Sequence, residues 1–307
     1  MLRVARRASR GTSAVLGGAL ALAAPRVARA DPLMANDLAM GGAHRANPYS
    51  LATLLDAPAT LGLTERYDLG AGFRIGPDKQ RALQVAALDS RTSRVSAGIT
   101  WTRMAHENGL QTADLPGWVL PDTVIEEREV RHRVGAGVAL PLLNRQLAFG
   151  VAGWYDHRAT PDGEAGPGGN VTASVATKLA QDAVVLSVQS SNLLPWRLYY
   201  APLDVSAGLR LQAKELAAVE ANLVAPLGDT DHVLGFNLGA QVVAAEVVPL
   251  RVGFERDSET GTDRVTGGVG VEGDRGALDY GARFWVGAGR PDEGLASWHG
   301  ISLRLFF

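Results

Sequence analysis

The sequence feature that most restricts the fold is an alternation of apolar with small or polar residues, which persists from about Glu65 to Phe307. A clear example is LAFGVAGWYD, from Leu147 to Asp156, where odd positions are mostly apolar and even positions are small or polar, apart from Trp154. An alternation of period 2 predicts β-strands with two chemically different faces. The chain is therefore expected to be all-β over most of its length.

Alternation alone is compatible with two kinds of β protein. In a soluble β-sandwich the apolar face would be the core, and in a membrane barrel it would face lipid. After the N-terminal region the chain has no apolar stretch near 18 residues, so no helical membrane span is predicted. The composition is nevertheless apolar, at 46% hydrophobic residues. Both observations suit a barrel, in which only every second residue must face lipid.

The spacing of the turns favours the barrel. Every second connection is short, as at Arg91-Thr92 and Asp274-Arg275, whereas alternate connections are longer, as from Met104 to Ile125. Short turns at one rim and longer loops at the other are typical of outer-membrane barrels. The sequence thus predicts a closed antiparallel transmembrane β-barrel of about 14 strands, with its domain at 65–307 and strands at 65–76, 81–91, 93–103, 128–141, 145–158, 169–179, 183–192, 202–212, 215–225, 231–243, 246–256, 263–273, 276–288 and 297–307.

The N-terminus has the pattern of a secretory signal peptide. Four arginines between Arg3 and Arg10 precede an apolar run, and Ala28-Arg29-Ala30 stands before Asp31. We expect residues 1–30 to be a cleaved signal peptide, with a retained anchor as the alternative. Removal of its six arginines leaves 24 basic against 32 acidic residues, so the mature chain is acidic and has no electrostatic footprint for nucleic acid. Since the chain has no cysteine, it has no disulfide or thiolate metal site.

The segment 31–64 lies between the expected signal peptide and the first strand. Its leucines, Leu51, Leu54 and Leu55, have a helical spacing that is interrupted by Pro48 and Pro58. The segment is predicted to be a partly helical hatch that plugs the lumen. The alternative is a loosely ordered periplasmic extension.

Residues in this segment carry a family resemblance. Gly41-Gly42-Ala43 and the stretch to Leu61 resemble the opening of FadL-type and PorV-type outer-membrane proteins, which have a small-residue GGA and an Asn-Pro-Ala-Gly-Leu box. Ala57 and Thr60 replace the Asn and the Gly of that box. The resemblance implies a 14-stranded barrel with an N-terminal hatch. FadL-type members pass hydrophobic molecules inward, and PorV-type members assist protein secretion. The hatch-box residues are Gly41, Gly42, Pro58, Ala59 and Leu61.

In each predicted strand, the polar face should point into the lumen. These faces carry charges of both signs, which predicts a lumen of mixed charge. These charges have two possible roles: a polar pathway that includes contacts to the hatch, or salt bridges that fill the interior. Salt bridges are favoured because an unpaired buried charge is costly. The candidate lumen and hatch residues are Arg66, Asp68, Arg74, Arg131, Arg133, Asp204, Arg210, Arg251, Glu255, Asp279, Arg283 and Arg304.

Glycines and aromatic residues add two further expectations. The strand positions predicted to face the lumen are rich in glycine, which leaves room for a hatch or lets strands coil tightly. The aromatic residues, among them Trp101, Tyr155 and Trp285, are expected in an interfacial girdle. The expected inward glycines are Gly70, Gly72, Gly98, Gly135, Gly137, Gly150, Gly208, Gly235, Gly239, Gly253, Gly281 and Gly300.

The sequence has no recognisable catalytic or metal-binding motif, so we expect no enzyme activity and no cofactor. The leading hypothesis is an outer-membrane barrel that passes small hydrophobic or amphipathic molecules through a hatch-gated lumen. The second is a non-transporting interaction or secretion-accessory barrel whose 104–125 loop contacts a partner. A periplasmic β-sandwich enzyme remains if the protein is soluble. Expected partners are outer-membrane lipid, a hydrophobic small molecule and the barrel-assembly machinery. The last of these is implied by the alternating C-terminal strand, which ends on Phe307 and resembles the signal that this machinery reads.

Overall fold

A computed structural model describes residues 34–77, 80–109, 126–160, 163–194, 203–227, 234–257, 262–286 and 297–307. Fourteen strands form one closed barrel in which every strand pairs antiparallel with its sequence neighbours and β1 pairs with β14. The strands are β1 (Tyr67–Ile75), β2 (Arg81–Asp89), β3 (Ser96–Gly109), β4 (Glu126–Leu142), β5 (Leu147–Thr160), β6 (Gly163–Leu179), β7 (Val184–Ser191), β8 (Leu203–Ala213), β9 (Ala217–Leu227), β10 (Gly235–Ala244), β11 (Val248–Arg256), β12 (Asp263–Gly273), β13 (Gly276–Val286) and β14 (Ser297–Phe306).

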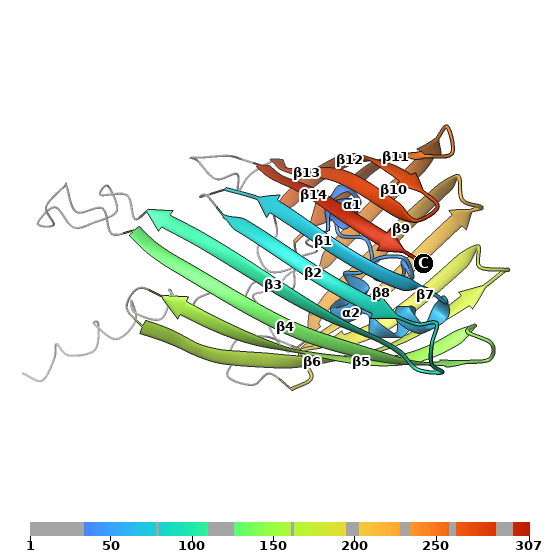
Figure 1. Cartoon of the computed structure of the whole chain (residues 1–307), viewed down its shortest axis with the longest axis horizontal. Coiled ribbons are helices and arrows are strands. Elements are labelled where there is room, and N and C mark those ends of the chain that lie inside the picture. Colours follow the sequence, from blue (N-terminus) through green and yellow to red (C-terminus); the bar gives the residue numbers. More distant parts are fainter. Residues whose placement is uncertain are drawn as a thin grey trace, which may run out of the picture.

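The predicted closed 14-stranded barrel is confirmed. The expected strand positions are close to those observed, and the largest differences concern the middle of the chain. The strand expected at 169–179 begins at Gly163, and the strand expected at 93–103 continues to Gly109. The short turns lie at the same rim as the C-terminus (Figure 1). The long 104–125 connection, a candidate partner-binding loop, lies mostly outside the described residues.

The outer face of the wall is an apolar band. Leu69, Ile99, Val151 and Leu223 are each about half exposed, and their neighbours along each strand point inward. An exposed band of this kind matches the lipid-facing surface of an outer-membrane barrel. Trp101 and Tyr155 also lie on the outward parity, as expected for girdle residues. No helix among the described residues is long and apolar enough to cross a membrane.

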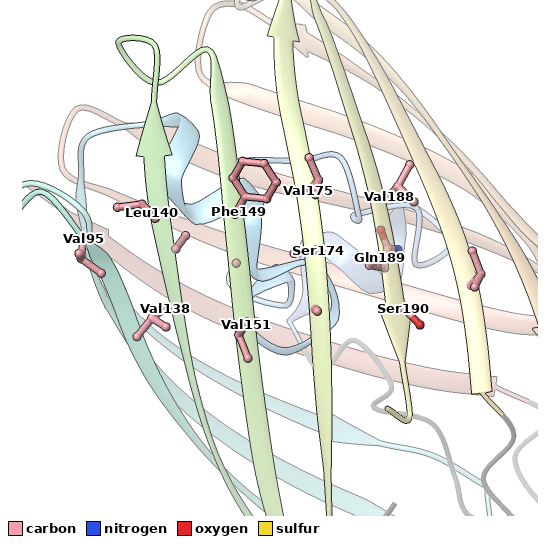
Figure 2. Close-up of a pocket in the computed structure, with 14 residues that line it drawn as sticks. Val95, Val138, Leu140, Phe149, Val151, Ser174, Val175, Val188, Gln189 and Ser190 are labelled. Atoms are coloured by element: carbon pink, nitrogen blue, oxygen red, sulfur yellow. The ribbon is translucent and has the colours of Figure 1, made fainter. Parts of the chain in front are cut away.

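One part of this outer face is hollowed. An apolar groove of about 670 Å³ runs across β4–β8, between projecting side chains that include Phe149, Val151 and Val188 (Figure 2). Small residues such as Gly150 and Ala173 leave its floor low. The groove lies on the outer face of the wall, away from the lumen.

Three short helices lie inside the barrel (Figure 1): α1 (Ala35–Ala39), α2 (Thr53–Asp56) and the 3₁₀ helix η1 (Pro58–Leu63). Leu51, Leu54 and Leu61 are at most 1% exposed. Because these helices are only four to six residues long, they are too short to be stable alone, and the surrounding wall must hold their conformation.

Candidate functional site

The candidate site is the boundary between the barrel wall and the segment from Met34 to Leu63, which we call the hatch. Helix α1 contacts β1 and β11–β14, α2 contacts β3–β5, and η1 contacts β3–β6. The hatch therefore lies against most of the barrel circumference. This placement agrees with a plug inside the lumen and differs from a loose periplasmic extension.

A belt of glycines makes room for the hatch. A Cβ at Gly150 would lie 2.5 Å from the carbonyl carbon of Pro58, and one at Gly253 would lie 2.5 Å from the backbone nitrogen of Gly41. Such distances are shorter than van der Waals contact, so a side chain at these positions would displace the hatch backbone. The inward glycines at which a Cβ would contact the backbone or a side chain of the hatch are Gly70, Gly98, Gly135, Gly137, Gly150, Gly208, Gly239, Gly253, Gly268, Gly281 and Gly300.

Ten of the twelve glycines predicted to face inward belong to this belt. Their enrichment is thereby explained by the space that the hatch occupies. Two glycines of the hatch itself have a different role. Gly41 and Gly42 have φ values of +65° and +72°, which other residues adopt only with strain. They turn the chain after α1 directly against the backbone of β11.

Neutral side chains of the wall hydrogen-bond the hatch backbone. The amide of Asn237 donates to the Gly41 carbonyl at 2.5 Å, and the amide of Asn222 donates to the Gly42 carbonyl at 3.0 Å. Similar bonds join Ser302 to the Ala35 N–H, Thr266 to the Ala39 carbonyl, Ser187 to the Arg45 carbonyl and Ser174 to the Ala59 N–H. A buried backbone group left without its partner costs about 1–3 kcal/mol. These six bonds, from six strands, therefore fix the hatch firmly.

Arg145 fastens the exit of the hatch at the short-turn rim. Its Nη1 donates to the carbonyls of Gly62 and Thr64, its Nη2 donates to the Ser90 carbonyl at 2.6 Å, and its Nε pairs with Glu65 at 3.0 Å. The guanidinium thus joins the β4–β5 turn to the β2–β3 turn and to the junction between η1 and β1. The planar fork of arginine suits such multiple contacts, which lysine could not reproduce.

The side of the hatch that faces β2–β5 is apolar. Leu51, Leu54, Leu55, Leu61 and Met34 of the hatch form one buried cluster with Ala86, Leu88, Ala139 and Ala152 of the wall, and Trp154 packs against it. Most wall members are small, so the leucines fill the space that alanine and glycine leave. We call this cluster the seam.

All twelve charged residues predicted for the lumen are buried on the inner face. Most form ion pairs: Arg66 with Asp68 at 2.7 Å, Arg131 and Arg133 with Asp156, Arg210 with Glu220, Arg251 and Arg304 with Asp279, and Arg283 with Glu255 at 3.1 Å. The guanidinium of Arg74 lies 4.0 Å from the Trp298 ring centroid, and Asp204 is 7% exposed. This arrangement matches the interpretation of paired charges that fill the lumen.

The hatch-box residues occupy defined positions. Pro58 begins η1, where its missing N–H costs nothing, and Ala59 and Leu61 are fully buried. Ala59 is the residue whose N–H binds Ser174. Gly41 and Gly42 form the turn against β11 described above.

Asp37 is a charged group inside the hatch that the sequence did not single out. Its Oδ1 accepts a hydrogen bond from the Ser50 hydroxyl at 2.7 Å, and its side chain is 1% exposed. Burial raises the pKa of Asp37 above its ordinary value, although His44, Arg304 and Arg251 oppose this shift. His44 in turn pairs with Asp56 of α2 at 2.8 Å.

The sequence interpretation missed the residues that actually hold the hatch. The serines, threonine and asparagines that make these bonds stand at positions that face the lumen, but the sequence-based prediction named only charged residues there. Arg145 lies in a turn, where no periodicity marks it. One aromatic expectation was wrong: Trp285 faces the lumen, with the Arg264 guanidinium 5.5 Å from its centroid, because it has the parity of Arg283. Within the described ranges, no cluster of three or more His, Cys, Asp or Glu side chains has the geometry to hold a metal.

Comparison with known proteins identifies the fold. No protein-family model and no curated sequence matches the chain. The crystal structure of the P. putida toluene transporter TodX is similar with a TM-score of 0.65 and 14% identity, and the match covers 91% of this chain and 98% of that one. The CymD monoaromatic hydrocarbon channel is similar with a TM-score of 0.62 and 12% identity, over 89% and 96% of the two chains. The chain therefore shares its fold with these two proteins, in agreement with the 14-stranded barrel and N-terminal hatch that the resemblance to FadL-type and PorV-type proteins implied.

Proposed function

We propose that this protein is an outer-membrane channel that passes small hydrophobic or amphipathic molecules through a hatch-gated lumen. The observation that carries the proposal is a closed barrel whose interior is filled by a short segment with a leucine-rich face. The similarity to proteins described as a toluene transporter and a monoaromatic hydrocarbon channel supports the same class of substrate. A filled, charge-paired lumen argues against a wide, water-filled porin.

The proposed organisation has three parts. Residues 1–30 are removed on export, residues 31–64 form the hatch, and residues 65–307 form the barrel. The charged lumen residues stiffen the wall around the hatch, while the glycines and neutral polar residues receive it. Mass spectrometry of the protein purified from outer membranes tests the first part, because the mature chain should begin at Asp31.

Uptake of radiolabelled toluene by outer-membrane vesicles tests the function. Vesicles with an intact lipopolysaccharide leaflet are required, because a simple phospholipid bilayer passes toluene by itself. Vesicles that contain the protein should take up toluene faster than matched vesicles without it, and uptake of a sugar should not change. Equal toluene uptake would reject the transport function and favour the second hypothesis, a non-transporting interaction barrel.

A further inference from the structure

The hatch is held to the wall in two chemically different ways. On one side, Asn222, Asn237, Thr266 and Ser302 hydrogen-bond the backbone of α1 and of the turn that follows it. On the side that faces β2–β5, the leucines of α2 and its neighbours pack on small wall residues. The two sides are thus expected to respond differently to an apolar molecule.

The physical cost of separation differs between the two sides. Opening the hydrogen-bonded side would leave buried backbone carbonyls and amides without their partners. Opening the seam replaces contacts between apolar side chains with contacts to an apolar molecule, so little is lost. An apolar molecule can therefore enter the seam at a lower cost than the hydrogen-bonded side.

Contacts to the wall hold the hatch on either side of α2, and within the hatch Asp56 at the end of α2 pairs with His44 at 2.8 Å. Upstream, Arg304 donates to the Tyr49 carbonyl at 3.2 Å, and downstream, Ser174 accepts from the Ala59 N–H at 2.7 Å. Between these points, Leu54 lies against Gly98 and Leu55 lies against Gly135. Both leucine side chains thus lie against glycines of the wall, which have no side chain to displace when a leucine changes its rotamer.

We infer that the hydrophobic cargo passes along the seam, between α2 and the inner faces of β2–β5, and that Leu54 and Leu55 are its gate. Trp154, which packs on the same cluster and has the Arg133 guanidinium 4.2 Å from its ring centroid, borders the seam. The hydrogen-bonded half, with α1, stays in place during passage. This inference rests on the proposed transport function.

Cysteine cross-links test the route, because the natural chain has no cysteine that could interfere. Leu54→Cys with Gly98→Cys links the hatch across the seam; a Cβ at Gly98 would lie 3.5 Å from Cγ of Leu54. Met40→Cys with Gly239→Cys is the matched control on the other side, with a Cβ to Cβ distance of 3.1 Å. The two Cβ atoms of a disulfide lie about 3.5–4.5 Å apart, so the control pair must separate by a few tenths of an ångström to form one.

Each pair is folded in its reduced state, oxidised, and assayed for toluene uptake in lipopolysaccharide-containing vesicles. Because Gly98 and Gly239 both lie in the glycine belt, each oxidised variant is compared with its own reduced form. We expect oxidation of the seam pair to reduce uptake to the level of vesicles without protein, with recovery after reduction, and oxidation of the control pair to cause no further change. Uptake that survives the seam link, or that both links abolish, overturns the route while leaving transport established. Loss of transport in the natural protein would instead refute the proposed function itself.

A second pair of variants avoids cross-linking. Leu54→Ala should increase toluene uptake because it widens the seam, whereas Leu38→Ala, at an equally buried leucine of α1, should not. Heat-modifiable migration confirms that both variants are folded. Equal effects of the two substitutions would contradict the assignment of the gate to α2.

Discussion

Substitution of Gly150 by alanine should loosen the hatch without unfolding the barrel. The added Cβ would lie 2.5 Å from the Pro58 carbonyl carbon and 2.7 Å from Cα of Ala59, and these are backbone atoms that cannot rotate away. η1 must therefore move, and the hydrogen bond between the Ala59 N–H and Ser174 is stretched or lost. Gly153, on the same strand, provides a control because a Cβ there would find its nearest neighbour, the Asn170 carbonyl, at an ordinary 3.5 Å.

The magnitude follows from two contributions. Overpacking costs about 1–3 kcal/mol, and loss of one buried backbone hydrogen bond costs about as much again. Together they weaken hatch docking by about 2–6 kcal/mol, or roughly 30-fold to more than 10⁴-fold in the docking equilibrium. Gly153→Ala should change it little.

Hydrogen exchange measured by mass spectrometry in detergent gives the readout. The peptide that contains η1 should exchange faster in Gly150→Ala by a factor in this range, while peptides from β5 and β6 keep their protection. Gly153→Ala should match the natural protein. If Gly150→Ala leaves η1 as protected as in the natural protein, the glycine belt is not what receives the hatch.

Three further predictions concern charged residues. Arg145→Ala should weaken hatch docking by about 2–4 kcal/mol through its lost hydrogen bonds, seen as faster exchange near the start of β1. Lys178→Ala should not, because Lys178, at the end of β6, pairs with the exposed Asp182 of the next turn. Burial raises the pKa of Asp37, so the undocked hatch loses the Asp37 proton at a lower pH than the docked hatch does. Hatch stability should therefore fall as the pH rises from the ordinary carboxyl pKa towards the raised one. Asp37→Asn should remove this pH dependence and raise the thermal midpoint at neutral pH. Arg251→Met should lower barrel stability by about 3–5 kcal/mol in urea, because it removes a partner from the fully buried Asp279; equal stability would show that the pair contributes nothing.

Strand period and turn spacing were sufficient to predict the barrel. In LAFGVAGWYD, for instance, Phe149 and Val151 face lipid while Ala148 and Ala152 are buried, as their parity requires. The predicted strand at 169–179 was too short because Gly163–Gly168 contains Pro167 and three glycines, which resemble a loop. Its pairing with β5 overrides that local composition.

The candidate site was less predictable for a physical reason. Inward glycines could be read from parity, and ten of them do meet the hatch. Hydrogen bonds to the hatch depend instead on which wall position lies beside which hatch carbonyl, as for Asn222 and Gly42, which are far apart in sequence. No pattern of spacing encodes that register. The same holds for Arg145, whose partners belong to two other segments, the end of the hatch and the β2–β3 turn.

The central claim, that the hatch closes the lumen, is tested most directly by removing it. Deletion of residues 31–63, with the signal peptide and β1 retained, should leave a folded, heat-modifiable barrel whose single-channel conductance in a planar bilayer is far above that of the natural protein. The increase is expected because the glycine belt would then line an empty space. A folded barrel with unchanged conductance would contradict the account.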